Sequence, residues 1–574
     1  MKKIYKSIFI CGLSGVVILG LTGCGPKDDG LRRDQKIAET ESEGVNMGDV
    51  ATEVLEGEML SGLPLMIDFK THKYQYMRNQ SIDVFAGYMT VSKSVFEFGA
   101  ALPHTYKYPN GYYNGPLGES KKLFDKIYHA YFFADNDTHG LPEWKAIAQI
   151  VYAYSMQELV DFFGTVPYDD YRALKQNPPL NYLSCEEVYD RILNDLDDAV
   201  NVLNLRQPSA DALKRIEGTR GGLSNLNWQN WVKFANSIRL RMALNMVKAN
   251  PGRAQEVAQI AVAGGVLTED FAYYQDGTVE HPLYGISSIW NDSRLGASLL
   301  NIMQRLSNPL LDVWFSKNAT AIKSASGAVT LAATKGYAGM RQGCLVDPTP
   351  KTGGYGSFSK FQVQYMPRSY FKVTEVLFLQ AEGALRGWAM GGTAKDFYER
   401  GIKRSFEENG LDNAAYEKYI KLAKAKAIDY RDYYKTENSI ADLTRGVQIG
   451  VKWATEIPEG DNRADIREVQ LEQIITQKYI ANFPQGAEAW TTFRRTGYPR
   501  LFPVPETIYW DDRSFDNELQ VRRIPYDMNS SNDELNRSGI EAALGGANNA
   551  GTRIWWDVRT EQRDAANRIV PVNF

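Results

Sequence analysis

The apolar residues of the chain recur at the spacing of helices that bury one face. One such pattern begins near residue 141 and stops at Gly164, with Pro167 beyond it, as is typical of a helix end. Its apolar positions are Trp144, Ile147, Val151, Tyr154, Leu159 and Phe162. A second stripe over 188–203 follows Ser184 and Glu187, which have the spacing of a capping box. These patterns predict two antiparallel helices joined by a loop.

Three further pairs of helical patterns follow along the chain. They cover 228–247 with 253–263, 374–385 with 394–408, and a segment that starts near Ile466 and passes through Tyr479 into 486–495. Repeated helix pairs that each bury one face on a neighbour are typical of a solenoid, although no strict repeat length is present. The stretches between them, rich in Gly, Pro, Asn and Tyr, are expected to be irregular, and loops of that length usually carry function. These stretches are 98–119, 269–292, 334–361 and 501–552.

The first 46 residues follow a different pattern. Three lysines precede an apolar run over 7–21, which is typical of a secretory signal and too short to span a membrane. The tetrad that ends in Cys24 resembles a bacterial lipobox, in which the signal is cleaved before the cysteine and the sulfur is acylated. We expect 1–23 to be a signal peptide, 24–46 a lipidated cysteine with a flexible tether, and 47–574 the folded part. A free or disulfide-bonded Cys24 is the alternative.

Composition narrows the classes of partner. The chain of 574 residues has a net charge of −4 and no basic cluster interleaved with aromatics, so we expect no nucleic-acid partner. It carries 33 Tyr, 24 Phe and 11 Trp, of which most are expected in the core; the remainder suit surfaces that bind amphipathic ligands such as sugars. Once Cys11 leaves with the signal and Cys24 is lipidated, Cys185 and Cys344 remain, and they form one disulfide or none.

Catalytic and metal-binding motifs are poorly supported. The five histidines contain no HExxH spacing, no phosphate-binding loop is present, and the carboxylate pair of a glycosidase cannot be identified from spacing. Residues 135–140 begin like a calcium loop, but His139 occupies a ligand position and Ala146 replaces the final glutamate, which favours a plain turn. We therefore assign no catalytic residue, no metal site and no cofactor.

Seven stretches, in order, resemble the SusD/RagB family. They are 151–170, 183–200, 231–244, 374–388, 477–499, 522–526 and 554–557, and the likeness runs from about residue 60 to the C-terminus. The resemblance implies a mostly α fold, in which four tetratricopeptide-like helix pairs form a scaffold for a large, irregular, loop-rich region that bears the ligand site. It also implies that Trp490, Arg494, Arg495, Tyr498, Trp555 and Trp556 are structural.

The resemblance further implies a function. Members of the family are cell-surface lipoproteins that bind glycans or other nutrients and cover a SusC-like TonB-dependent outer-membrane transporter. We therefore expect a lipid-anchored outer-membrane protein that binds an oligosaccharide without catalysis. The segment Lys27-Asp28-Asp29 is similar to the export signal of Bacteroides-group surface lipoproteins. The alternatives are a surface glycoside hydrolase, a binder of a non-sugar nutrient such as a peptide, and a structural or adhesion lipoprotein.

Three loop clusters offer the chemistry that glycan binding needs. Flat aromatic faces stack on the sugar, while amides, carboxylates and guanidinium groups bind its hydroxyls. One of the clusters includes Tyr337-Ala338-Gly339, which resembles a Tyr-x-Gly loop of the family. Plain packing of each loop is the alternative to ligand contact. The candidate ligand-binding residues are Tyr106, Tyr112 and Tyr113, then Tyr284, Trp290, Asn291 and Asp292, and finally Tyr337, Arg341 and Tyr355.

Overall fold

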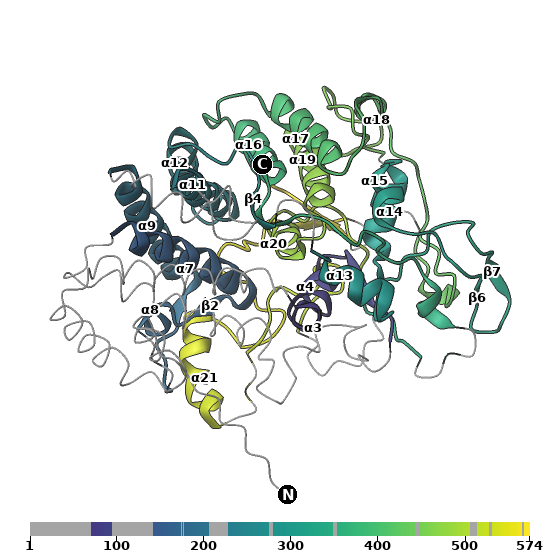
Figure 1. Ribbon diagram of the computed structural model, residues 1–574, viewed down its shortest axis with the longest axis horizontal. Coiled ribbons are helices and arrows are strands. Elements are labelled where there is room, and N and C mark those ends of the chain that lie inside the picture. Colours follow the sequence, from purple (N-terminus) through teal and green to yellow (C-terminus); the bar gives the residue numbers. More distant parts are fainter. Residues whose placement is uncertain are drawn as a thin grey trace, which may run out of the picture. The chain divides into compact units, whose positions relative to one another are not determined.

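Pairs of long helices dominate the part of the chain that the computed structural model describes (Figure 1). That part lies within one compact unit, Leu55–Phe574. The described residues are 70–93, 142–173, 175, 177–205, 228–274, 279–347, 350, 353–441, 448–505, 514–526, 528, 531–564 and 568–574. None of the helices among them is long and apolar enough to cross a membrane.

The first helix pair is α7 (Pro142–Phe163) with α9 (Cys185–Leu205). Helix α7 ends as predicted at Gly164, whose φ of 80° is left-handed and suits glycine. The predicted capping box is confirmed, because the Ser184 hydroxyl donates to Glu187 Oε2 at 2.7 Å and the Glu187 amide donates back at 3.3 Å. Between the helices lie α8 (Tyr168–Arg172) and the antiparallel strands β2 (Thr165–Val166) and β3 (Leu183–Ser184).

The other three predicted pairs are also present, with bounds within a few residues of expectation. Helix α11 packs against α9 and α16, and α16 packs against α19, so that the pairs follow one another through direct contacts (Figure 1). This succession confirms the predicted helix-pair scaffold. The pairs are α11 (Trp228–Asn245) with α12 (Pro251–Ala263), α16 (Val373–Leu385) with α17 (Ala394–Glu408), and α19 (Ile466–Asn482) with α20 (Gly486–Thr496).

Short elements connect and flank these pairs. Strand β1 (Met89–Val91) pairs antiparallel with β5 (Ser293–Leu295), which ties the chain before the first pair to the chain between the second and third. Strands β4 (Phe271–Tyr274) and β8 (Arg368–Phe371) also pair antiparallel, and both lie between the second and third pairs. The elements are α3 (Thr71–Tyr74), η3 (Gln75–Asn79), α4 (Ile82–Phe85), β1 (Met89–Val91), β4 (Phe271–Tyr274), α13 (Pro282–Tyr284), η6 (Gly285–Ile289), β5 (Ser293–Leu295), α14 (Ala297–Arg305), α15 (Leu310–Trp314), β6 (Ile322–Lys323), β7 (Val329–Leu331), η7 (Gly354–Ser357), β8 (Arg368–Phe371), α18 (Asn413–Tyr419), η8 (Thr436–Asn438), α21 (Ser531–Leu544), β9 (Gln562–Arg563) and β10 (Ile569–Val570).

Three of the stretches predicted to be irregular contain regular structure, although in 334–361 the described element is the 3-10 turn η7 (Gly354–Ser357). The prediction is wrong for 501–552, which includes the 14-residue helix α21, and for 269–292, which includes β4 and α13. Helix α21 lacks the apolar stripe that identifies a helix in sequence. Among its described side chains, the buried ones are Asn536 and Ile540. The stretch 98–119 lies outside the described residues.

The signature aromatic and basic residues lie in the core, as predicted, with Trp555 half-buried. Trp490 is fully buried and donates from its indole to the Val521 carbonyl oxygen at 3.1 Å. The Arg494 guanidinium lies 3.7 Å from the Trp490 ring centroid, and the Trp556 indole donates to Asp161 at 2.8 Å. Cys185 and Cys344 are both buried and both free, so the open question of a disulfide between them is answered.

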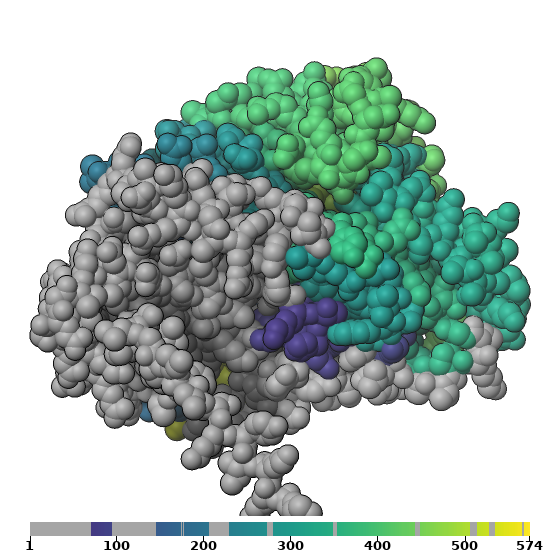
Figure 2. All heavy atoms as spheres, viewed as in Figure 1, coloured from purple at the N-terminus to yellow at the C-terminus, as the bar shows by residue number. Residues whose placement is uncertain are grey.

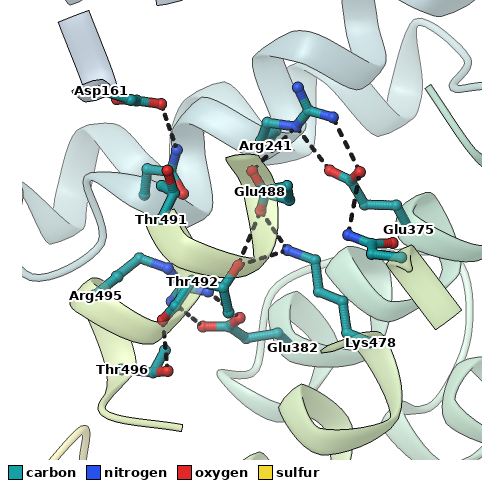
Figure 3. A network of polar contacts seen from close by, with 12 residues as sticks. Asp161, Arg241, Glu375, Glu382, Lys478, Glu488, Thr491, Thr492, Arg495 and Thr496 are labelled. Atoms are coloured by element: carbon teal, nitrogen blue, oxygen red, sulfur yellow. Dashed lines mark hydrogen bonds and ion pairs between the residues drawn. The ribbon is translucent and has the colours of Figure 1, made fainter. Parts of the chain in front are cut away.

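A network of buried ion pairs connects helices of different pairs (Figure 3). Arg241 of α11 binds Glu375 of α16 at 2.7 Å, and Lys478 of α19 binds Glu488 of α20 at 2.5 Å. Glu488 also lies 3.4 Å from Arg241, which joins these two pairs.

A further ion pair anchors α20 to α16. Arg495 makes two hydrogen bonds to Glu382, at 2.6 and 2.7 Å, and Arg386 adds another at 2.8 Å. Burial on its own raises the pKa of Glu382, but the charges of Arg495 and Arg386 outweigh it and lower the pKa to about 2. Glu382 is therefore ionised in the folded protein.

Replacing Glu382 with glutamine is expected to destabilise the fold strongly. The change leaves Arg495, which is buried, without a charged partner, and breaking one side of such a pair costs about 3–5 kcal/mol. Denaturant unfolding measures the change. The control is Glu417→Gln, which removes a pair with Lys421 whose side chains are 48% and 74% exposed, and it is expected to change stability by less than about 0.5 kcal/mol.

The difference in stability between the natural protein and Glu382→Gln should also depend on pH. Because the pKa of Glu382 is lower in the folded protein than its ordinary value of 4.5, its contribution to stability is full above pH 4.5 and is lost as the pH falls to about 2. The difference between the natural protein and Glu382→Gln should therefore shrink over that interval. A difference that stays constant with pH would contradict the role of the carboxylate charge.

Candidate functional site

A surface cleft of about 580 Å³ lies beside α14 and α15. One wall comes from these two helices, with Asn301, Asn308 and Asp312 among its polar residues. The segment 426–433 forms another wall, and Tyr337 lines the cleft as well. The volume lies within the range of about 300–1,000 Å³ that is usual for small-molecule sites.

The loop that carries Tyr337 is clamped to the start of α14. The Met340 amide donates to the Leu295 carbonyl oxygen at 2.8 Å, and the Ala297 amide donates to the Met340 carbonyl oxygen at 2.8 Å. At Gly339 a Cβ would lie 2.9 Å from the Ala297 Cα, so only glycine permits this approach. The Tyr430 hydroxyl also donates to the Gly339 carbonyl oxygen, at 3.1 Å. The backbone under Tyr337 is therefore fixed from two sides.

The side chain of Tyr337 is half-buried and its hydroxyl donates to the Asp312 carboxylate. Burial first, and then the hydrogen bond and charge of Asp312, raise the pKa of Tyr337 above its ordinary value, so the hydroxyl stays protonated. Lys317 places its Nζ 5.9 Å from the ring centroid. Tyr337 thus presents a ring of fixed direction beside a carboxylate and an ammonium group.

The opposite wall supplies a second tyrosine. Tyr433 is half-buried, and the Arg431 guanidinium lies 5.3 Å from its ring centroid. Its carbonyl oxygen accepts from the Thr330 hydroxyl at 2.5 Å, which fixes the backbone there. Tyr430, by contrast, is buried and packs with Phe502 at 5.1 Å between ring centroids. Two tyrosine rings among amides and charged groups can bind a ligand that has both apolar faces and hydroxyls.

The second predicted cluster forms one tight turn at the surface. Trp290 is 39% exposed, and Tyr284 at the end of α13 is half-buried. Asn291 adopts a left-handed φ of 60° and accepts from Lys360 Nζ at 2.5 Å. Asp292 is buried, where it accepts from the Gln75 amide at 2.8 Å and pairs with Lys93 at 2.5 Å. This turn joins the 70–93 segment, which Figure 2 shows in purple beside teal residues.

The predicted site residues are only partly brought together. Among the residues described as lining the cleft, Tyr337 is the one that the sequence singled out, and the Trp290 turn is separate from it. Arg341 donates to the Pro503 carbonyl oxygen at 2.7 Å, and Tyr355 is buried with its hydroxyl on Asp432 at 2.9 Å. These two side chains hold neighbouring loops in place and are not among the described lining of the cleft. Tyr106, Tyr112, Tyr113 and Cys24 lie outside the described residues.

Sequence reasoning missed Asp312, Arg431 and Tyr433. The run Arg431-Asp432-Tyr433-Tyr434 is a signal that could have found two of them, since it places aromatics beside charge in a segment without helical periodicity. Asp312 lies on the short helix α15, where nothing in the local sequence indicates contact with Tyr337. Among the residues that the structure describes, no cluster of His, Cys, Asp and Glu could hold a metal ion, and the calcium-like stretch 135–140 is not among them.

The two glycines that flank Tyr337-Ala338 allow a matched test of the loop. Gly339→Ala should destabilise the protein by about 1–3 kcal/mol, because the new methyl group meets the α14 backbone. Gly336→Ala should change stability by less than about 0.5 kcal/mol, since its Cβ would meet nothing closer than a Leu331 methyl at 3.6 Å. Thermal unfolding compares the two, and equal effects would contradict the clamped loop.

Several solved structures have a fold similar to that of this chain. A chitin-binding SusD homologue from Flavobacterium johnsoniae is 29% identical, with a TM-score of 0.73 over 88% of this chain and 99% of that chain. SusD homologues from Bacteroides ovatus (30% identity, TM-score 0.68, 88% and 99% covered) and Bacteroides thetaiotaomicron (27%, 0.70, 89% and 99%) are also similar.

No curated protein matches the sequence. The likeness to SusD homologues confirms the predicted mostly α fold with its tetratricopeptide-like helix pairs. The family described as "Susd and RagB outer membrane lipoprotein" matches residues 37–557, which is most of the chain. The protein therefore belongs to the SusD-like family of outer-membrane lipoproteins.

Proposed function

We propose that this protein binds an oligosaccharide at the cell surface and delivers it to a SusC-like TonB-dependent transporter without breaking a bond. The observation that carries the proposal is the cleft in which Tyr337 and Tyr433 lie among Asn301, Asp312 and Arg431. Aromatic rings bind the CH-rich faces of sugars, and amide, carboxylate and guanidinium groups bind their hydroxyls. The Trp290 turn offers a further exposed aromatic face.

A chitin-derived oligosaccharide is the first ligand to test. The Flavobacterium johnsoniae homologue is a chitin-binding protein and aligns with 88% of this chain. The N-acetyl group of such a sugar has an amide donor and acceptor, for which the exposed Asp312 carboxylate and the half-buried Gln304 amide on the cleft wall provide partners. Its pyranose ring has the apolar face that stacks on tyrosine.

The proposed lipid anchor would allow the protein to function with only modest affinity for the sugar. A lipid on Cys24 and the tether 24–46 would keep the cleft beside the transporter, where a high effective concentration replaces tight binding. The lipobox around Cys24 and the membership of an outer-membrane lipoprotein family support this location.

Calorimetry with chito-oligosaccharides, on a soluble form that begins at Val45, tests the site. Tyr337→Ala is expected to weaken binding about tenfold, the equivalent of about 1.4 kcal/mol, because a stacking face is lost. Tyr337→Phe keeps the ring and loses the hydrogen bond to Asp312, so it should weaken binding less. The control is Tyr365→Ala, a tyrosine that is 54% exposed and lies outside the described lining of the cleft.

Two outcomes would contradict the proposal. If Tyr337→Ala and Tyr365→Ala bind equally well, the cleft is not the site. If product analysis after incubation detects shorter sugars, the protein is a hydrolase; Asp312 and Asp429, which both line the cleft, would then be the first carboxylates to replace. Absence of binding across a broad glycan array would favour a peptide ligand.

Replacing Cys24 with serine should release the protein from the membrane, because the acylated sulfur is lost. Metabolic labelling with a fatty acid followed by membrane fractionation measures the result. The natural protein should carry label and sediment with outer membranes, whereas Cys24→Ser should do neither. Cys185→Ser is the control, since that cysteine is buried and free in the fold. Label that persists in Cys24→Ser would contradict the anchor.

A further inference from the structure

A second cavity, of about 60 Å³, lies where the end of α20 meets the C-terminal segment. It shares no described lining residue with the Tyr337 cleft. Its lining is strongly basic and comprises Lys248, Arg494, Arg495, Arg500 and Arg522, together with the acidic residues Glu518 and Glu561. Burying so many cations around a small cavity is unfavourable unless negative charges balance them.

Three of the five cations have carboxylate partners outside the described lining. Arg495 binds Glu382 at 2.6 Å, Arg500 binds Glu472 at 3.1 Å, and Arg522 binds Asp557 at 2.5 Å. These ion pairs fix the three guanidinium groups as part of the core, so the remaining two cations, Lys248 and Arg494, are the ones whose charge needs balance.

Neither Lys248 nor Arg494 pairs with a carboxylate of the described residues. Lys248 donates from Nζ to the Thr560 hydroxyl at 2.6 Å. Burial first, and then the charges of Arg495 and Arg386, lower the pKa of Lys248 to about 8, against the weaker opposing effect of Asp557 and Glu468. Its ammonium group is thus enclosed beside a neutral hydroxyl, with no carboxylate of the described residues in direct contact.

Arg494 has the same deficit. It is buried, donates to the Arg522 carbonyl oxygen at 2.8 Å and to the Thr491 hydroxyl at 3.0 Å, and lies against the Trp490 and Trp556 rings. Its hydrogen-bond acceptors are thus neutral oxygens, and its guanidinium faces are covered by aromatic rings. Burial lowers its pKa to about 9, even though Asp161 and Asp557 act in the opposite direction. Two cations of the same cavity lining are therefore held without a direct carboxylate partner among the described residues.

The acidic residues of the lining are engaged elsewhere. Glu561 pairs with Arg553 at 2.5 Å and with Arg559 at 3.5 Å. Glu518 accepts a hydrogen bond from the Ile569 amide. Among the described residues, both carboxylates of the lining are therefore held by other partners, and neither pairs with Lys248 or Arg494.

We propose that this cavity binds a small oxyanion, sulfate or phosphate, with Lys248 as its principal ligand. The oxyanion accepts a charge-assisted hydrogen bond from Lys248 Nζ and lies in the positive potential of Arg494. The group is either a free ion or the ester group of a sulfated sugar. The site is independent of oligosaccharide binding at the Tyr337 cleft.

Calorimetry on the purified full-length protein tests the site, with sodium sulfate titrated at constant ionic strength. Lys248→Met is expected to weaken sulfate binding about tenfold or more, because a charge-assisted hydrogen bond is lost. The matched control is Lys233→Met on helix α11, the helix that ends three residues before Lys248. Lys233 is also half-buried and donates to a threonine hydroxyl, at 3.5 Å from Thr268 Oγ1, but it does not line the cavity. The control variant should bind sulfate like the natural protein.

The natural protein alone provides a second measurement, which holds even if Lys248→Met fails to fold. Sulfate keeps its charge between pH 7 and 9, whereas Lys248 with a pKa of about 8 loses its proton over that range. The charged groups that face Lys248 or line the cavity with it are Arg386, Arg494, Arg495, Arg500, Arg522, Asp557, Glu468, Glu518 and Glu561. Burial lowers the pKa of Arg494 to about 9, so any loss of its charge toward pH 9 acts in the same direction as that of Lys248. Affinity should therefore fall about tenfold from pH 7 to pH 9.

Binding of N-acetylglucosamine 6-sulfate, compared with binding of the unsulfated sugar, distinguishes a sulfate-ester site from a site for the free ion. Binding of free sulfate alone identifies an ion site, and binding of the sulfated sugar but not its parent identifies a sulfate-ester site; both support the proposal. No binding of either at millimolar concentration overturns it. Equal binding by Lys248→Met and Lys233→Met, or affinity that does not change with pH, overturns it as well.

Discussion

Buried opposite charges determine how the helix pairs of this protein are placed. A carboxylate buried without a partner is strongly unfavourable, so once Glu382 of α16 is enclosed, Arg495 of α20 has to lie within hydrogen-bond reach. The same holds for Arg241 of α11 and Glu375 of α16. Apolar side chains tolerate small sliding movements between helices, whereas a two-point contact between guanidinium and carboxylate does not. The network therefore sets the register of the second, third and fourth helix pairs.

Both proposed ligand sites take their geometry from that scaffold. The loop of Tyr337 rests on the first residues of α14, where the absence of a side chain at Gly339 lets two backbones meet. The basic cavity follows from the end of α20, because Arg494 adjoins the anchored Arg495 in the same turn. Irregular segments can carry precise sites when rigid elements fix them at several points.

The sequence predicts the scaffold well because helix periodicity is a local property. It misses α14, a helix of nine residues that is too short to show several turns of a helical period, and it misses α21 because that helix buries little. The cleft is harder to predict, since Asp312, Tyr337 and Tyr433 come from segments far apart in the chain. Tyr355 shows the limit most clearly: it shares an irregular stretch with Tyr337, yet its ring lies in the core, because no period governs which side chains of a loop turn inward.

The direction of the Tyr337 ring is set within the chain itself, by the hydrogen bond from its hydroxyl to Asp312. If the proposed sugar binds there, this ring does not have to be ordered first, so the contact adds no conformational step to association or dissociation. A protein that retains its ligand for long is favoured by closing around it. For the proposed transfer to a transporter, rapid exchange of the ligand is the advantage, and a tyrosine ring already oriented on an open cleft wall permits it.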